Sequence, residues 1–212
     1  PILDWDVSKV TDMANIFSWL KVESFSFANW DTSKVGNMYY MLAGLPLDGW
    51  DLTNLNTSSA NNMSNMFEGC TCTKTLDLSH FITDNVTSMR FMFTKATLTE
   101  LIGTEKWNTD KVTNILAMFN DTKTITEINL SSFNTSLVTG CTSLVTNSSI
   151  KTVYYDSLLW TLDKFNSPTV TWIVAPSKNN GYWLDMTGIT GATTITLTNE
   201  NNLPTEDILT DW

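Results

Sequence analysis

The stretch Trp30-Asp31-Thr32-Ser33-Lys34-Val35 decides the fold, because it recurs along the chain. Similar hexapeptides begin at Trp5 and Trp107, and three further copies fill the gaps. Each copy begins with an apolar anchor, spaced 25 or 26 residues from the next: Trp5, Trp30, Leu55, Phe81, Trp107 and Phe133. A fixed period of this length is typical of solenoids, in which stacked repeats share one core.

Apolar residues follow each anchor at regular positions, which in the second repeat are Val35, Met38 and Met41-Leu42. This spacing puts one apolar stripe on a short helix of about two turns. The polar run Asp31-Thr32-Ser33 stands just before it, where side-chain oxygens cap free N–H groups. We therefore predict a short helix in every repeat, with its methionines in the core.

A short alternating stretch precedes most anchors: residues 25–27, 50–52, 76–78 and 128–130. Alternation with period two predicts a half-buried strand. Repeat five departs from the pattern at Leu101-Ile102-Gly103, and one extra residue precedes Trp107, so we expect a bulge or a loosened strand there. Stacked units of this kind would place their strands in one parallel sheet.

The repeat resembles that of the BspA-like leucine-rich-repeat surface proteins, including the related mycoplasma lipoprotein repeat. Residues 78–81 and 85–93 are similar to that pattern, and residues 66–70 carry its Met-Phe-x-Gly-Cys ending. Leu55, Ala60 and Cys141 depart from it. The resemblance implies an exposed role in adhesion or recognition, and the repeat is also similar to ones in phage appendage proteins.

We predict an α/β solenoid that is leucine-rich-repeat-like, with a parallel β-sheet on one face and short helices on the other. Residues 1–155 would form six regular coils of 25–26 residues, and residues 156–212 the irregular terminal coils and a C-terminal cap. Strand-like stretches continue at 169–174 and 193–198, and a hairpin is expected at 182–184. Trp183 and Trp212 suit a cap that shields the end of the core.

The composition excludes some functions. The chain of 212 residues carries a net charge of −10 and is rich in Thr (34), Asn (21) and Ser (19). A nucleic-acid surface needs clustered Lys and Arg, so this class is not expected. No apolar run approaches the roughly 20 residues that span a bilayer, so we expect no membrane insertion of this segment. Cys70, Cys72 and Cys141 are interpreted as small buried thiols whose oxidation state is open.

No catalytic, cofactor or metal site is predicted. The single histidine, His80, cannot form a recognisable triad or a two-histidine metal motif. Acidic residues recur at repeat corners, where capping explains them, and none matches the spacing of an EF-hand loop. We therefore expect a non-enzymatic protein.

The candidate binding residues are the middle residues of the predicted strands, which point away from the core: Ser26, Asp51, Asp77 and Asn129. Thr152, Thr171 and Thr196 would extend this stripe. Variable strand positions on the sheet face are where solenoids usually bind partners. A merely solvated face is the alternative interpretation. The polar, slightly acidic stripe suits a glycan or a basic protein patch.

The functional prediction is an extracellular module for adhesion or recognition on a bacterial surface, binding a host or neighbouring-cell protein or glycan. The alternative is a structural or receptor-binding appendage on a phage virion surface. Because Pro1 begins almost inside the first repeat, we also expect sequence to be missing before it or a partner to cover that end. Self-association there is a further expectation.

Overall fold

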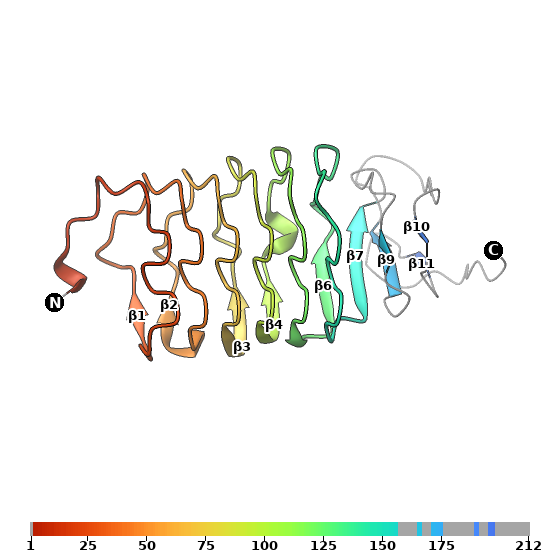
Figure 1. Ribbon diagram of the computed structural model, residues 1–212, viewed down its shortest axis with the longest axis horizontal. Coiled ribbons are helices and arrows are strands. Elements are labelled where there is room, and N and C mark those ends of the chain that lie inside the picture. Colours follow the sequence, from red (N-terminus) through yellow and green to blue (C-terminus); the bar gives the residue numbers. More distant parts are fainter. Residues whose placement is uncertain (1, 157–164, 167–170, 176–188, 191–194, 198–212) are drawn as a thin grey trace.

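The computed structural model describes residues 2–156, 165–166, 171–175, 189–190 and 195–197. These residues form a stack of coils that runs from the N-terminus toward β11 (Figure 1). The strands are β1 (Phe25–Ser26), β2 (Trp50–Asp51), β3 (Thr71–Asp77), β4 (Thr97–Ile102), β5 (Lys123–Thr124), β6 (Glu127–Leu130), β7 (Thr152–Asp156), β8 (Phe165–Asn166), β9 (Thr171–Ala175), β10 (Ile189–Thr190) and β11 (Ile195–Leu197). Three 3₁₀ turns complete the described elements: η1 (Ile2–Asp4), η2 (Leu47–Gly49) and η3 (Thr104–Lys106).

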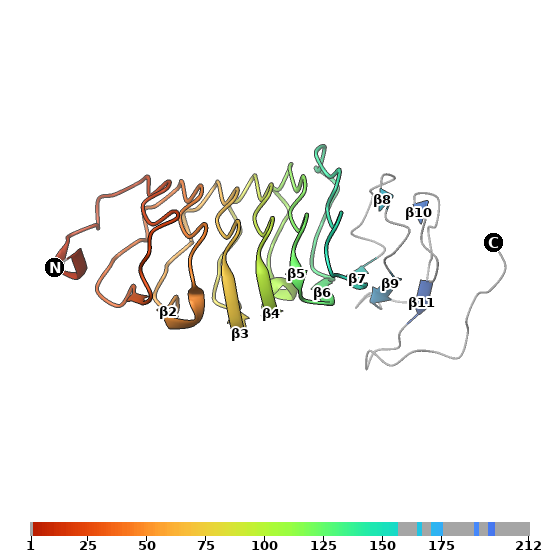
Figure 2. The same cartoon turned by 60° about the horizontal axis from the view of Figure 1, so that its bottom comes forward.

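All described strand pairs are parallel and join one coil to the next. The sheets have the orders β1-β2, β3-β4-β5, β6-β7-β9-β11 and β8-β10. Phe25 pairs with Trp50, which shows that each coil advances by one repeat. Strands β2 to β7 lie along one side of the stack (Figure 2), and β1 lies on the same side as β2 and β3 (Figure 1). The predicted parallel sheet is therefore present, but among the described strands it is interrupted between β2 and β3 and again between β4 and β6.

A second parallel row runs along the stack as single β-bridges that link six residues, one in each repeat: Asp12, Asn37, Asn62, Ser88, Asn114 and Gly140. The amide side chains reinforce it, since Asn37 Nδ2 donates to Asp12 Oδ2 at 3.1 Å and Asn62 Nδ2 donates to Asn37 Oδ1 at 3.2 Å. Their oxygens also accept from the backbone two residues on, as Asn62 Oδ1 does from Ser64 N at 3.0 Å. This ladder explains part of the asparagine content.

The predicted helices are wrong. Residues 2–156 contain no α-helix, and the apolar stripe lies instead on a chain of tight turns. Phe67 N–H donates to Met92 O of the next coil at 2.9 Å, whereas Met66 N–H stays within its own turn and donates to Met63 O at 3.3 Å. An α-helix needs every N–H for its own i−4 carbonyl, so sharing alternate groups between coils excludes it.

Left-handed backbone conformations mark these turns. They recur at the tenth and fourteenth positions after each anchor, with φ between 52° and 72°: Asn15, Trp19, Tyr40, Gly44, Asn65, Gly69, Phe91, Lys95, Ala117, Asp121, Ser143 and Asn147. A helix of L-residues cannot include such a residue every few positions. The apolar period that predicted a helix therefore reports the spacing of turn corners.

The core consists of side-chain columns that run along the stack. In the fourth repeat Val86, Met89, Met92 and Phe93 are all fully buried. Phenylalanines stack from coil to coil, with ring centroids 5.3 Å apart for Phe67–Phe93 and 5.1 Å for Phe93–Phe119. The anchors are buried too, except for Trp5 in the first repeat, which is 57% exposed.

In the second to sixth repeats, buried threonines close a corner of the coil, two residues after the anchor: Thr32, Thr57, Thr83, Thr109 and Thr135. Thr57 Oγ1 donates to Ile82 O at 2.9 Å and accepts from Ile82 N at 2.8 Å. One hydroxyl thus satisfies both backbone groups of a residue in the next coil. In the predicted cap of the second repeat, Thr32 therefore bridges two coils, whereas Asp31 Oδ1 accepts from Ser33 N within its own turn at 3.0 Å.

Most of the predicted terminal region lies outside the described residues, including the hairpin at 182–184, Trp183 and Trp212. Within it, β9 and β11 fall in the stretches where strands were expected. No helix in the described part of the chain is long and apolar enough to cross a membrane.

Candidate functional site

The predicted binding residues lie on the sheet at matching positions of their coils. Ser26 pairs with Asp51, and Asn129 pairs with Tyr154 in β7. Asp77 pairs with Ile102, a partly exposed apolar residue that the predicted stripe did not include. Asp51 and Asp77 are exposed, whereas Ser26 and Asn129 are half-buried.

The expected extension by three threonines divides between two rows. Thr152 pairs with Thr171, and on its other side with Glu127, so both threonines lie two residues before the Asn129 row. Thr196 pairs with Ile173, which in turn pairs with Tyr154. The sheet face therefore carries two parallel rows of residues.

Each predicted stripe residue also holds the turn that follows its strand. Asp51 Oδ1 accepts from Thr53 N at 3.1 Å and from Thr53 Oγ1 at 2.6 Å, and Asp51 Oδ2 accepts from Ser26 Oγ at 3.1 Å. Asp77 Oδ1 accepts from Ser79 N at 2.8 Å. Hydrogen bonds from Thr53 lower the pKa of Asp51, and hydrogen bonds from Ser79 lower that of Asp77.

A hollow of about 260 Å³ lies between β2 and β3, where Asp51, Asp77 and His80 converge. His80 Nε2 lies 2.8 Å from Leu52 O, so this nitrogen donates to a backbone carbonyl. Asp48, at its edge, accepts from Thr73 N at 2.8 Å. The hydrogen bonds of His80 and Asp48 are thus made within the protein, to backbone groups of neighbouring coils. In the described residues no group of three His, Cys, Asp or Glu side chains is placed to hold a metal ion.

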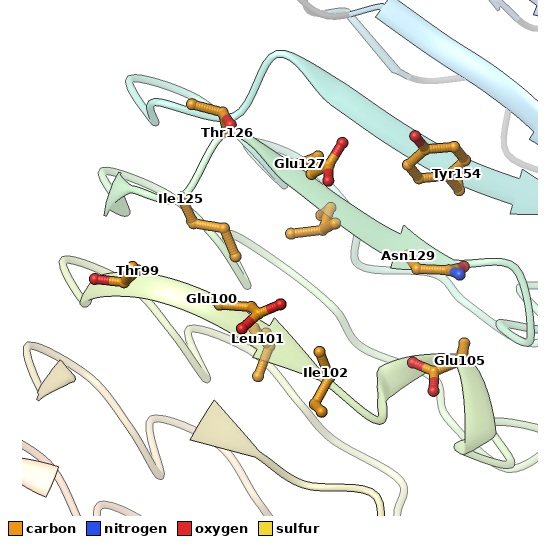
Figure 3. A pocket seen from close by; sticks show the side chains of 11 residues that line it. Thr99, Glu100, Leu101, Ile102, Glu105, Ile125, Thr126, Glu127, Asn129 and Tyr154 are labelled. Atoms are coloured by element: carbon orange, nitrogen blue, oxygen red, sulfur yellow. The ribbon is translucent and has the colours of Figure 1, made fainter. Parts of the chain in front are cut away.

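A larger groove of about 700 Å³ opens between β4 and β6 (Figure 3). Four residues that were not predicted, Glu100, Glu105, Glu127 and Tyr154, line it together with Asn129. The buried side chains of Leu101, Ile125 and Ile128 line it from below, and Ile102 is 37% exposed at its side. Its volume falls within the range of about 300–1,000 Å³ that ligand sites occupy.

The groove exists because the chain leaves the sheet between β5 and β6. β4 pairs with β5 only at Thr97–Lys123 and Leu98–Thr124. At Thr124 φ is 77°, and Ile125 N–H donates to Lys123 O at 3.0 Å. This is the geometry of a γ-turn, which is rare and strained for a β-branched residue. β6 then begins at Glu127, and of the described strands it pairs only with β7.

The charged side chains that line the groove are the carboxylates Glu100, Glu105 and Glu127. Glu105 Oε2 accepts from Gly103 N at 2.9 Å, and the Glu100 carboxylate accepts from Thr75 Oγ1. Partial burial, and then the neighbouring Glu127 carboxylate, raise the pKa of Tyr154, whose hydroxyl donates to that carboxylate. Among the described residues, no Lys or Arg lines the groove.

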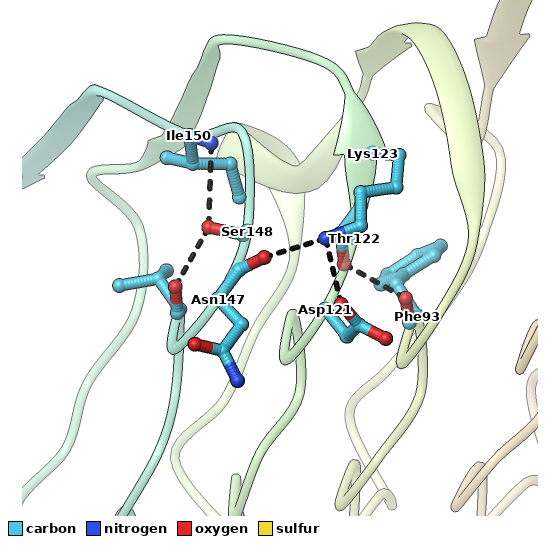
Figure 4. Close-up of polar contacts among 8 residues, drawn as sticks. Phe93, Asp121, Thr122, Lys123, Asn147, Ser148 and Ile150 are labelled. Carbon is cyan, nitrogen blue, oxygen red and sulfur yellow. Dashed lines mark hydrogen bonds and ion pairs between the residues drawn. The ribbon is translucent and has the colours of Figure 1, made fainter.

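The lysine beside the strained turn is bound elsewhere (Figure 4). Lys123 Nζ lies 2.6 Å from Asp121 Oδ1 and donates to Asn147 O at 2.7 Å. Next to it, Thr122 is fully buried and donates to Phe93 O at 2.9 Å. Lys123, two residues before the lining residue Ile125, is thus held by neighbouring turns and does not line the groove.

One feature of the sequence marks the position of the groove that was not predicted. The departure of repeat five at Leu101-Ile102-Gly103 marks the coil that borders the groove, and Gly103 has a φ of 96°. The shift in strand register that was expected there lies instead in β3, between Cys72 and Thr75.

All three cysteines are buried, as predicted, and no disulfide joins them: Cys70, Cys72 and Cys141. Burial raises the pKa of the Cys70 and Cys72 thiols. Their environment therefore disfavours the reactive thiolate.

A family model described as "Mycoplasma protein of unknown function, DUF285" matches residues 1–100 and 62–183. No curated protein and no solved structure shows significant similarity to the chain. The match agrees with the mycoplasma-type repeat of the predicted resemblance and names no BspA-like or leucine-rich-repeat family. Because the matched residues span most of the sequence, the chain belongs to the DUF285 family.

Proposed function

We propose that the chain is a non-enzymatic, extracellular recognition module of the BspA-like leucine-rich-repeat kind, which binds a protein or a glycan through its exposed sheet face. The observation that carries the proposal is that different sides of each coil have different roles. The bridge row, the turn corners and the threonine corner hold the stack together, and the sheet face presents outward side chains.

This division supports recognition because the outward residues can change without loss of the core. Each coil repeats the same backbone pairing, while the outward row reads Ser26, Asp51, Asp77, Ile102 and Asn129. A rigid scaffold with variable positions on one face is how solenoid proteins build binding surfaces.

The second candidate is a structural or receptor-binding appendage of a phage virion. The observation that favours it is the apolar surface of the first coil, where Ile2, Trp5, Trp19 and Leu20 are 40–60% exposed. Several exposed large apolar residues within one coil would suit a contact with another chain. Such a contact would suit assembly into a particle as well as self-association.

Fractionation of the producing cells and of purified particles separates the two candidates. Recovery of the chain with the cell envelope is expected for the recognition module, and recovery in particles at a fixed copy number would favour the appendage. Recovery only in the cytosol would contradict both.

Binding through the sheet face is tested on glycan arrays and host-cell surfaces with paired variants. Asp51→Asn with Asp77→Asn keeps the oxygens that cap the turns and removes two charges from the face. The control, Asp84→Asn with Asp110→Asn, removes two exposed charges whose carboxylates accept from Asn108 and Asn134 at repeat corners. Loss of capture in the first pair alone is expected. Equal capture by both pairs would refute use of this face.

A further inference from the structure

The groove between β4 and β6 combines unpaired strand edges with uncompensated negative charge. β4 pairs with β3 as far as Ile102, but on its other side only its first two residues pair, with β5. All four residues of β6 pair with β7, and no described strand pairs with its other edge. The two edges face each other across the groove (Figure 3).

The gap is closed at both ends. At one end β4 and β5 pair through Leu98–Thr124. At the other end Thr104 Oγ1 donates to Asn129 O at 2.6 Å, which ties η3 to β6. The opening is therefore a slot of limited length whose long walls are strand backbone.

The backbone of these walls points to a polypeptide ligand. An unpaired strand edge presents N–H and C=O groups in the spacing of another strand, and extended peptides bind such edges by adding to the sheet. A glycan offers no matching row of alternating donors and acceptors. The apolar side chains of Ile102 and Ile125 would contact alternate side chains of the bound segment.

The acidic side chains around the slot favour a ligand with positive charge. Glu100 and Glu127 line it from opposite strands, and Glu105 lines it from η3. Among the described residues none of these three glutamates forms an ion pair, and the neighbouring Lys123 is paired with Asp121. Lys or Arg side chains of a ligand would supply the missing positive charge, whereas acidic ligands would be repelled.

We propose that this slot binds an extended peptide segment of a partner protein that carries Lys or Arg side chains. The proposal deepens the proposed function, on which it rests for the identity of the binding face. It selects a basic protein segment over a glycan as the partner.

The test measures binding of a defined probe, a fluorescent hexapeptide of alternating Lys and Val, to the whole chain by anisotropy. Two matched probes accompany it: one with Glu in place of Lys, and one with the same sequence but N-methylated at alternate residues. The site variant is Glu100→Gln with Glu127→Gln, which keeps the oxygens that accept from Thr75 and Tyr154. The control variant, Glu23→Gln with Asp110→Asn, removes two exposed charges outside the groove.

The lysine probe is expected to bind the parent and the control variant alike, and to bind the site variant about tenfold more weakly. The glutamate probe should not bind, and N-methylation should weaken binding because it removes backbone donors. Equal affinity of parent and site variant would overturn the role of the glutamates. Equal affinity of the methylated probe would overturn strand addition.

The outcome is independent of where the chain is found in the cell. If the lysine probe fails to bind while Asp51→Asn with Asp77→Asn abolishes capture of a surface partner, the slot proposal is wrong and the proposed function stands. If the probe binds as expected but the chain is recovered only in the cytosol, the slot is real and the extracellular role is wrong.

Discussion

Replacing Met89 with Asp tests the assignment of the core column. Met89 is fully buried, and its position falls between Met63 and Ile115 in successive coils. Its backbone N–H donates to Asn114 O at 2.9 Å, and a side-chain substitution leaves this bond available. Met89→Asn serves as the control, because Asn has nearly the same size and shape as Asp but cannot ionise.

The expected magnitude follows from the cost of burying a charge. Full burial raises the pKa of a carboxyl by about 3–5 units, and each unit corresponds to about 1.36 kcal/mol. At pH 7, about 3 units above the unfolded pKa of about 3.9, the introduced Asp should therefore lower the free energy of unfolding by about 4 kcal/mol more than Asn does. Since domains are stable by about 5–15 kcal/mol, this difference is a large part of the total stability.

The sign of the pH dependence is specific. The folded-state pKa of the introduced Asp is raised, so its penalty is fully present above that pKa and shrinks as the pH falls toward the unfolded value of about 3.9. The native Asp51 and Asp77 have lowered pKa values and lose their own stabilisation below about pH 4. That loss affects both variants equally and cancels in the difference.

Urea unfolding followed by far-ultraviolet circular dichroism at pH 8, 6 and 5 measures this difference. The Asp variant should unfold at much lower urea than the Asn variant at pH 8, and the gap should narrow at pH 5. An Asp variant that unfolds at the parent's urea midpoint would show that Met89 is not in the core. A gap that does not change with pH would show that the carboxyl is not buried.

Three further substitutions or measurements check other parts of the stack. Gly44→Ala should lower the free energy of unfolding by about 2 kcal/mol, because φ is +72° and the new Cβ would lie 2.2 Å from the Trp19 ring; circular dichroism melting measures it. Thr57→Val should lower the stability by about 2 kcal/mol and speed amide exchange at Ile82, whereas Thr57→Ser should preserve the protection. The Cys70 thiol, whose pKa burial raises, should react with a disulfide reagent at pH 8 only after unfolding in urea.

The sequence predicted the solenoid because its strongest signal is the repeat. The positions of the anchors and of the Val and Met columns correctly predicted which side chains are buried, as Val86 and Met89 illustrate. The helices were wrong because apolar spacing reports only which side chains face the core. Whether Phe67 N–H bonds within its own coil or to Met92 O depends on the neighbouring coil, which is not a local property of the sequence.

The sequence predicted the sheet face but not its most hollow part. Asp51, Asp77 and Asn129 occupy the outward positions that alternation indicates, although each also bonds to the turn after its strand. The groove residues Glu100 and Tyr154 were missed because the groove depends on a missing strand pair. A gap between β4 and β6 follows from the path of the chain at Thr124, and alternation carries no information about it.

That path gives a last prediction, which concerns the strain at Thr124. Its φ of 77° costs a β-branched residue about 1–3 kcal/mol, and its side chain is exposed, so little packing is lost on truncation. Glycine adopts this conformation freely but costs about 0.5–1 kcal/mol in an ordinary strand. Thr124→Gly should therefore raise the free energy of unfolding by about 1 kcal/mol, and Thr124→Ala, which keeps a Cβ, should not. Urea unfolding of both variants measures this. A Gly variant less stable than the parent would mean that the turn which opens the groove is unstrained.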